Sequence, residues 1–97
     1  MKAYKHLIKF ALAKGLTVSV WDGEEWQVKR STAYRTIVRA VESVEEAQLR
    51  IRDASGTVLG WALVSAFGLE DDETVVDNTM TPLMTQWDDA YNATQGA

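Results

Sequence analysis

The sequence contains no cysteine, one histidine and one proline among its 97 residues. Without cysteine, disulfides, cysteine-ligated zinc and thiol catalysis are excluded. The single histidine, His6, also disfavours the usual Ser-His and Cys-His catalytic arrangements, and its lysine neighbours predict that it lies at the surface. A small domain that needs no disulfide is typical of a reducing compartment, so we expect a cytoplasmic location.

Long hydrophobic runs are missing as well. The chain begins with alternating lysines, and neither a signal peptide nor a transmembrane helix is predicted, so no membrane partner is expected. With 46% hydrophobic and 25% charged residues, the composition is that of an ordinary globular protein. The length leaves room for one domain, which we place at residues 1–97.

Basic residues are absent after Arg52, although the net charge is only −4. Residues 1–40 carry eight Lys or Arg against three acids, and residues 41–97 carry two Arg against eleven acids. Such asymmetry indicates either two functional surfaces or two halves that attract each other, within the fold or across a homodimer.

Three stretches have apolar residues at helical spacing. The first ends at Gly15, which suits a left-handed C-terminal position. Ser31 or Thr32 is expected to cap the second, and Thr81-Pro82 to start the third. The third should run to about Tyr91, with residues 92–97 frayed. The apolar stripes are Tyr4, Leu7, Ile8, Ala11 and Leu12; Tyr34, Ile37, Val38 and Val41; and Leu83, Met84, Trp87 and Tyr91.

Residues 16–21 and 25–29 are predicted to be the strands of a hairpin around Asp22-Gly23. A two-residue loop would put the apolar side chains on opposite faces. A three-residue loop pairs Val18 with Trp26 and gives Gly23 the left-handed position, so we prefer that register.

A second hairpin is predicted from residues 47–52 and 57–65, with a turn at 53–56. A four-residue turn pairs Ile51 with Val58, Leu49 with Gly60 and Ala47 with Ala62, which makes one face small and apolar. Residues 66–78 are expected to form a long acidic connection. The predicted fold is α+β in the order αββαββα: an antiparallel sheet of two hairpins with helices packed on one face, and a C-terminal helix.

The opposite face of the second hairpin would carry five side chains that need an explanation. Either the third helix folds back and Trp87 covers them, or they form a homodimer or partner interface anchored by Trp61 with flanking arginines. Because one helix is too short to cover this whole face, we expect a homodimer. The five residues are Leu59, Trp61, Leu63, Arg50 and Arg52.

An acidic surface is formed by Glu70, Asp71, Asp72, Glu73 and Asp77. It lacks the alternating ligands and central glycine of a calcium loop, so we expect no metal and no cofactor. The default interpretation is a solvated loop. The alternative is that these carboxylates resemble nucleic-acid phosphates and bind a basic host protein.

The basic residues of the N-terminal half could instead contact nucleic acid, although no RNP, KH or helix-turn-helix motif is present. Their simplest interpretation is the solvated sides of two helices. No convergent polar cluster meets the requirements of an active site, so we expect no enzyme. The residues concerned are Lys2, Lys5, Lys9, Lys14, Lys29, Arg30, Arg35 and Arg39.

Four stretches together resemble small uncharacterised accessory proteins of tailed bacteriophages: 18–31 (VSVWDGEEWQVKRS), 43–53 (SVEEAQLRIRD), 60–64 (GWALV) and 68–74 (GLEDDET). The resemblance implies action by binding, commonly to host enzymes or defence systems, in the cytoplasm of the infected bacterium. The expected function is therefore a non-enzymatic binding protein that modulates or inhibits a host protein by covering its surface. The alternative, in which nucleic acid is the less favoured partner, is a nucleic-acid-associated protein that uses the basic half.

Overall fold

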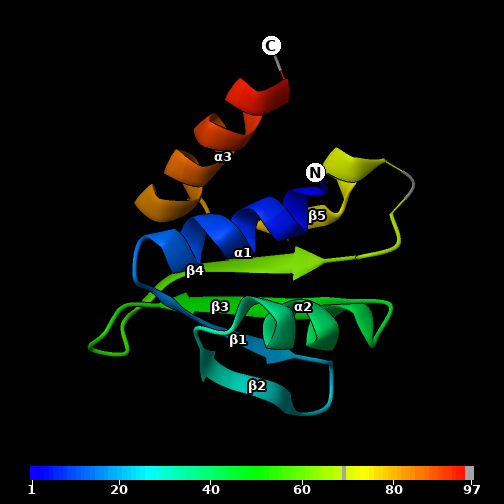
Figure 1. The fold of residues 1–97 in the computed structure, drawn as a ribbon, viewed down its shortest axis with the longest axis vertical. Helices are drawn as coiled ribbons and strands as arrows, with labels where there is room; N and C mark the ends of the chain where they lie inside the picture. The colour runs from blue at the N-terminus through cyan, green and yellow to red at the C-terminus, as the bar shows by residue number, and fades with distance from the viewer. Residues whose placement is uncertain (69, 96–97) are drawn as a thin grey trace.

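A computed structural model describes residues 1–68 and 70–95 of the chain (Figure 1). Its described part is α+β, as predicted, with three helices and an antiparallel sheet of five strands. The elements are α1 (Ala3–Ala13), β1 (Thr17–Trp21), β2 (Trp26–Ser31), α2 (Tyr34–Glu42), β3 (Ala47–Arg52), β4 (Val58–Val64), a 3-10 turn η1 (Asp71–Glu73), β5 (Val75–Asn78) and α3 (Pro82–Gln95).

The strand order β2-β1-β3-β4-β5 joins two similar αββ units through their first strands. β1 and β3 pair antiparallel, and Ser19 lies opposite Arg50 at the middle of this ladder. On either side, Val18 lies opposite Ile51 and Val20 opposite Leu49. The centre of the sheet is therefore a near-symmetric pair of strands with the same alternation of apolar and polar residues.

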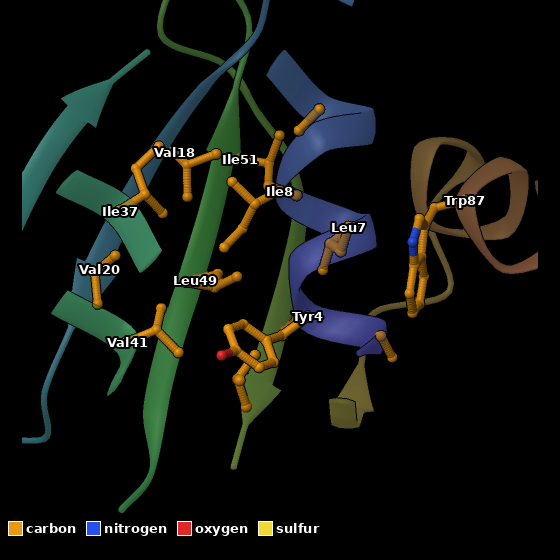
Figure 2. Close-up of a cluster of buried hydrophobic side chains, with 14 of the residues drawn as sticks. Tyr4, Leu7, Ile8, Val18, Val20, Ile37, Val41, Leu49, Ile51 and Trp87 are labelled. Carbon is orange, nitrogen blue, oxygen red and sulfur yellow. The ribbon is translucent and has the colours of Figure 1, made fainter. Parts of the chain in front are cut away.

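All three helices lie on one face of the sheet, which we call the inner face. Val18, Val20, Leu49 and Ile51 are fully buried there beneath α1 and α2 (Figure 2). α3 lies beside α1 rather than on the opposite face, and its Trp87 side chain points toward α1 (Figures 1 and 2). The apolar stripes predicted from the sequence make up most of this core, which also includes Ala62 and Val64 of β4.

The helix ends match the predictions only in part. Gly15 has a φ of 76°, and the Leu16 N–H reaches back to the Ala11 carbonyl, as predicted for the end of α1. Neither Ser31 nor Thr32 caps α2, because the N-cap position falls on Ala33. α3 continues to Gln95, so the predicted helix end at about Tyr91 is too early, and the fraying of the tail stays a prediction; residues 96–97 lie outside the described residues.

The predicted register of the first hairpin is wrong. Trp21 pairs with Trp26 and Val20 with Val28, so the loop has four residues rather than three. The Asp22 carboxylate accepts the N–H groups of Glu24 and Glu25, each at 2.8 Å, which stabilises this longer loop. Gly23 nevertheless has the expected positive φ, 105°.

The second hairpin is also shifted, by two residues along β4. Ile51 pairs with Gly60 instead of Val58, and Leu49 with Ala62 instead of Gly60. Since a shift of two preserves the face of a side chain, Gly60 and Ala62 lie on the predicted small apolar face. The prediction is wrong for Val58, because the bulge at Leu59 places Val58 opposite Arg52, where it is exposed. The connection at 66–78 was not predicted to contain a strand, but its end forms β5 at the edge of the sheet.

Candidate functional site

The face of the sheet opposite the helices, which we call the outer face, has no helix packed against it among the described residues. α3 cannot cover it, because Met84 lies against Gly60 on the inner side. A Cβ added to Gly60 would come within 2.7 Å of the Met84 sulfur. The alternative in which the third helix folds back over Trp61 is therefore wrong.

Three half-buried tryptophans occupy this outer face. Trp21 and Trp26 meet edge to face, with ring centroids 5.1 Å apart. Trp61 lies on β4, and its indole N–H donates to Gln48 Oε1 at 3.1 Å. The tryptophans thus lie on both sides of β3, with their positions fixed by neighbouring strands and side chains.

A β-bulge in β2 brings two consecutive basic residues to the same place. Val18 pairs with Ser31 and Val20 with Val28, so Lys29 and Arg30 together lie opposite the single residue between them on β1, Ser19. Arg30 has a φ of 48°, a left-handed conformation that is unusual for arginine. Its N–H donates to Ser19 Oγ at 2.9 Å, which holds the bulge closed.

Two arginines of β3 face the same point from the other side. Arg50 lies over the Trp26 ring, with its guanidinium carbon 5.1 Å from the centroid. Arg52 donates from Nη1 to Ser19 Oγ at 3.1 Å. Between them is a shallow hollow of about 280 Å³, which we call the basic hollow. It is lined by Ser19, Trp26, Lys29, Arg30, Arg50 and Arg52.

Within residues 1–68 and 70–95, the four cations of the basic hollow have no carboxylate partner within ion-pair distance. The one ion pair among residues 1–68 and 70–95 is Lys5 with Glu42, at 3.9 Å on the helical side. Asp22 and Asp53 accept hydrogen bonds within their own hairpin loops. Hydrogen bonds from the Glu25 and Glu24 N–H groups lower the pKa of Asp22, and the Ser55 hydroxyl lowers the pKa of Asp53.

Ser19 is the least exposed residue of the hollow, at 2% of its surface. Its oxygen accepts hydrogen bonds from Arg30 and Arg52, but its own hydroxyl hydrogen has no acceptor within the described part of the chain. A neighbour on the same face of β1, Thr17, has a buried hydroxyl oxygen with no hydrogen-bond partner among the described residues. Two hydroxyl groups of β1, those of Ser19 and Thr17, can therefore still form hydrogen bonds that the described residues do not satisfy.

The structure brings together four of the five residues proposed for the interface. Arg50 lies opposite Trp61, and Leu63 lies opposite Gln48, next to Arg50 on β3. Leu59 does not belong to this group, because it is the extra residue where β4 bulges between Val58 and Gly60. It packs against the core and lines a separate hollow with Leu16, Pro82 and Leu83.

The acidic surface lies away from the basic hollow. Glu70 and the η1 acids Asp71, Asp72 and Glu73 are exposed, and Asp77 pairs with Leu63 from β5, at the opposite edge of the sheet from β2. In the described residues, no three His, Cys, Asp or Glu side chains are grouped so that they could hold a metal ion.

The basic residues of the N-terminal half do not form one patch. Lys2 donates to the Ala66 carbonyl, Lys9 lies over Tyr34 and Lys14 over Phe10, whereas Lys29 and Arg30 join the two arginines of β3. Lys5 pairs with Glu42, and Arg35 and Arg39 are exposed on α2.

His6 is partly exposed, but it also contacts α3, which its lysine neighbours did not suggest. It lies on the side of α1 that faces α3, where its Nδ1 accepts the Trp87 indole N–H at 3.1 Å and its ring meets the Tyr91 ring edge to face. Burial, with a smaller effect from the N-terminal amine, lowers its pKa below the ordinary value of 6.5.

Comparisons with protein-family models, with curated proteins and with solved structures found no match. None of the described helices has both the length and the apolar character needed to span a membrane. The resemblance to bacteriophage accessory proteins therefore stays a prediction.

Proposed function

We propose that this chain is a non-enzymatic binding protein that holds single-stranded nucleic acid on the outer face of its sheet. The observation that carries the proposal is the combination of Trp21, Trp26 and Trp61 with four cations on a face that no described helix covers. Aromatic platforms beside cationic grooves are the recurring means of binding single strands without a sequence motif.

The arrangement suits unpaired bases better than a duplex. Neighbouring strands lie about 4.8 Å apart, so Trp26 on β2 and Trp61 on β4 are separated by three strand spacings, or about 14 Å. A nucleic-acid strand that crosses the sheet could stack bases at both positions, whereas paired bases would keep their faces inside the duplex. Arg50 lies between the two tryptophans, where it can contact the backbone.

The distribution of charge also favours binding of nucleic acid on the outer face. The protein is acidic overall, with a net charge of −4, yet the basic hollow gathers Lys29, Arg30, Arg50 and Arg52, which form no ion pair with a carboxylate of the described residues. An anionic strand would be repelled by the acidic residues of η1 and α3 and attracted to the basic hollow. If all four cations contact phosphates, the logarithm of the affinity should fall with the logarithm of salt with a slope of about −3.

The proposal is tested by titrating the protein with a 5′-hydroxyl, 3′-hydroxyl oligonucleotide and following tryptophan fluorescence at several salt concentrations. We expect saturable quenching that weakens steeply with salt, and an affinity about 5- to 150-fold lower for Trp26→Ala. Arg35→Gln, which removes one exposed charge from α2, is the matched control and should change affinity little. Absence of binding at low salt would overturn the proposal.

A homodimer through the same face is the second candidate, because Trp61 and Leu63 are only half-buried and Val58 is 46% exposed beside them. Sedimentation of the wild type and of Trp61→Ala over a range of concentrations separates the two. A wild type that stays monomeric at high concentration excludes the dimer. Modulation of a host protein through Glu70–Glu73 stays a prediction from the sequence.

A further inference from the structure

We infer that the basic hollow is a site for a terminal phosphate, so that the protein recognises the phosphorylated end of a single strand. This inference rests on the proposed function, since it assigns a ligand group to one part of the same face. It goes beyond that function because it predicts a preference between strands that differ only at one end.

Three of the four cations of the hollow, the arginines, are held by contacts within the protein. The Arg30 backbone is tied to Ser19, and its guanidinium lies against the β3–β4 turn, where a Cβ on Gly56 would be 3.2 Å from Arg30 Nη1. Arg52 is tied to Ser19 and Arg50 is stacked on Trp26. Because little side-chain ordering remains to be done on binding, these charges suit a compact anion rather than a diffuse one.

Ser19 adds a neutral donor at the base of the hollow. Its oxygen already accepts two hydrogen bonds, from Arg30 N and Arg52 Nη1, so it can offer only its hydroxyl hydrogen to a ligand. A group that brings acceptors and no donors fits this requirement. Phosphate oxygens are such acceptors, and they match the arginine donors on either side.

The amount of charge favours a terminal phosphate over an internal one. A phosphodiester carries one negative charge, whereas a phosphomonoester carries about 1.5 to 2 at pH 7. Four uncompensated cations converge here, more than a single diester would balance. The volume of about 280 Å³ lies just below the usual range of about 300–1,000 Å³ for whole small ligands, which suits one end group.

The backbone at Arg30 is a second sign that this place is built for binding. Arginine adopts a φ of 48° only at an energetic cost, and the surrounding structure holds it there through the Ser19 hydrogen bond. The bulge turns both Lys29 and Arg30 toward the hollow, whereas a regular strand would send one of them to the inner face. With the phosphate in the hollow, the adjoining base would reach the Trp26 ring.

The test compares four ligands of one sequence: a strand with a 5′-phosphate, one with a 3′-phosphate, one with hydroxyls at both ends, and the hydroxyl strand in the presence of inorganic phosphate. We expect one phosphorylated strand to bind at least about tenfold tighter than the hydroxyl strand, the effect of one added charge-assisted hydrogen bond or more. The preference should grow from pH 5.5 to pH 7.5, because the second ionisation of a phosphomonoester has a pKa of about 6. Inorganic phosphate should leave the hydroxyl strand largely bound.

Arg30→Gly removes a side chain of the hollow without disturbing the fold, because glycine accepts the left-handed backbone and keeps the N–H that bonds to Ser19. It should bind the hydroxyl strand more weakly than the wild type, because one cation of the proposed binding face is removed, and it should also lose the difference in affinity between phosphorylated and hydroxyl strands, with an unchanged circular dichroism spectrum. Arg35→Gln should retain the preference. Equal affinity for all strands, or a preference that survives Arg30→Gly, would overturn the end site and leave the proposed function standing. Absence of binding to any strand would overturn both.

Discussion

The inner and outer faces of the sheet are built from alternate residues of the same strands, yet they differ in almost every physical property. On β3, Leu49 and Ile51 point inward and are fully buried, whereas Arg50 points outward and is exposed. The inner face is covered by three helices (Figure 1), and no described helix packs on the outer one. The pleat of a strand makes this separation possible, because successive side chains point to opposite sides.

The two faces also differ in how regular their strands need to be. The inner face keeps its alternation through β1 and β3, where the register runs without a shift from Thr17–Arg52 to Trp21–Gln48. The irregularities lie in β2, in β4 and between β4 and β5, and the bulge in β2 supplies Lys29 and Arg30 to the basic hollow. We therefore expect stability to depend on the regular central pair, whereas the proposed binding would use the irregular strand beside it.

The largest expected effect is on the inner face. Leu49→Ala should lower the free energy of unfolding by about 2–5 kcal/mol, because it removes a fully buried side chain and leaves a cavity under the helices. Its neighbour Arg50→Ala, on the same strand and the opposite face, should cost less than about 1 kcal/mol. Urea unfolding of both variants measures the difference. Similar losses of unfolding free energy would contradict the expectation that the inner face contributes far more to stability than the outer face.

A smaller effect tests which face carries α3. Gly60→Ala should cost about 1–3 kcal/mol, since the new Cβ would lie 2.7 Å from the Met84 sulfur. Combining it with Met84→Ala should cost less than the sum of the two single changes, because the shortened side chain relieves the clash. Strict additivity in thermal or urea unfolding would show that α3 does not dock at Gly60.

Much of this organisation could be predicted from the sequence, and the reason is periodicity. The stripes containing Leu7, Ile37 and Met84 repeat at helical spacing, and residues 47–52 alternate, so the helices, the faces of the side chains in β3 and those of residues 60–64 in β4 followed directly. The α+β class followed from these elements. A shift of two residues leaves the face of a side chain unchanged, which is why the wrong register in the second hairpin still placed Gly60 and Ala62 on the inner face. The bulge at Leu59 changes the shift to one residue, so the faces of Val58 and Leu59 were predicted wrongly.

The remaining features depend on contacts that no local pattern records. β5 has four residues at the end of an acidic stretch, and the fully buried Thr74 before it accepts the Tyr4 N–H from the other end of the chain. The hollow needs a bulge that sets Lys29 and Arg30 opposite Ser19, and the adjacent basic pair was its only sequence signal. The common face of Trp61, Arg50 and Arg52 was predicted, because the alternation of large side chains along two paired strands can be seen in the sequence itself.

The smallest effect concerns pH and the helical layer over the inner face. His6 accepts the Trp87 indole N–H through Nδ1, so it must be neutral for α1 and α3 to keep this contact. Its pKa in the folded protein is lowered, mainly by burial, so below pH 6.5 the unfolded chain takes up a proton more readily than the folded one. Stability should therefore decrease as pH falls from about 7 to 5.5 and level off below the pKa of the folded protein. Because the pKa values of Asp22 and Asp53 are lowered, their protonation also removes stability on acidification, but only near and below the ordinary value of 3.8.

Thermal unfolding of the wild type and of His6→Gln at pH 5.5, 6.5 and 7.5 measures the effect of His6. The wild type should lose stability over this range and His6→Gln should not; the same loss in both would assign it to another group and leave the His6–Trp87 contact without a part in holding α3.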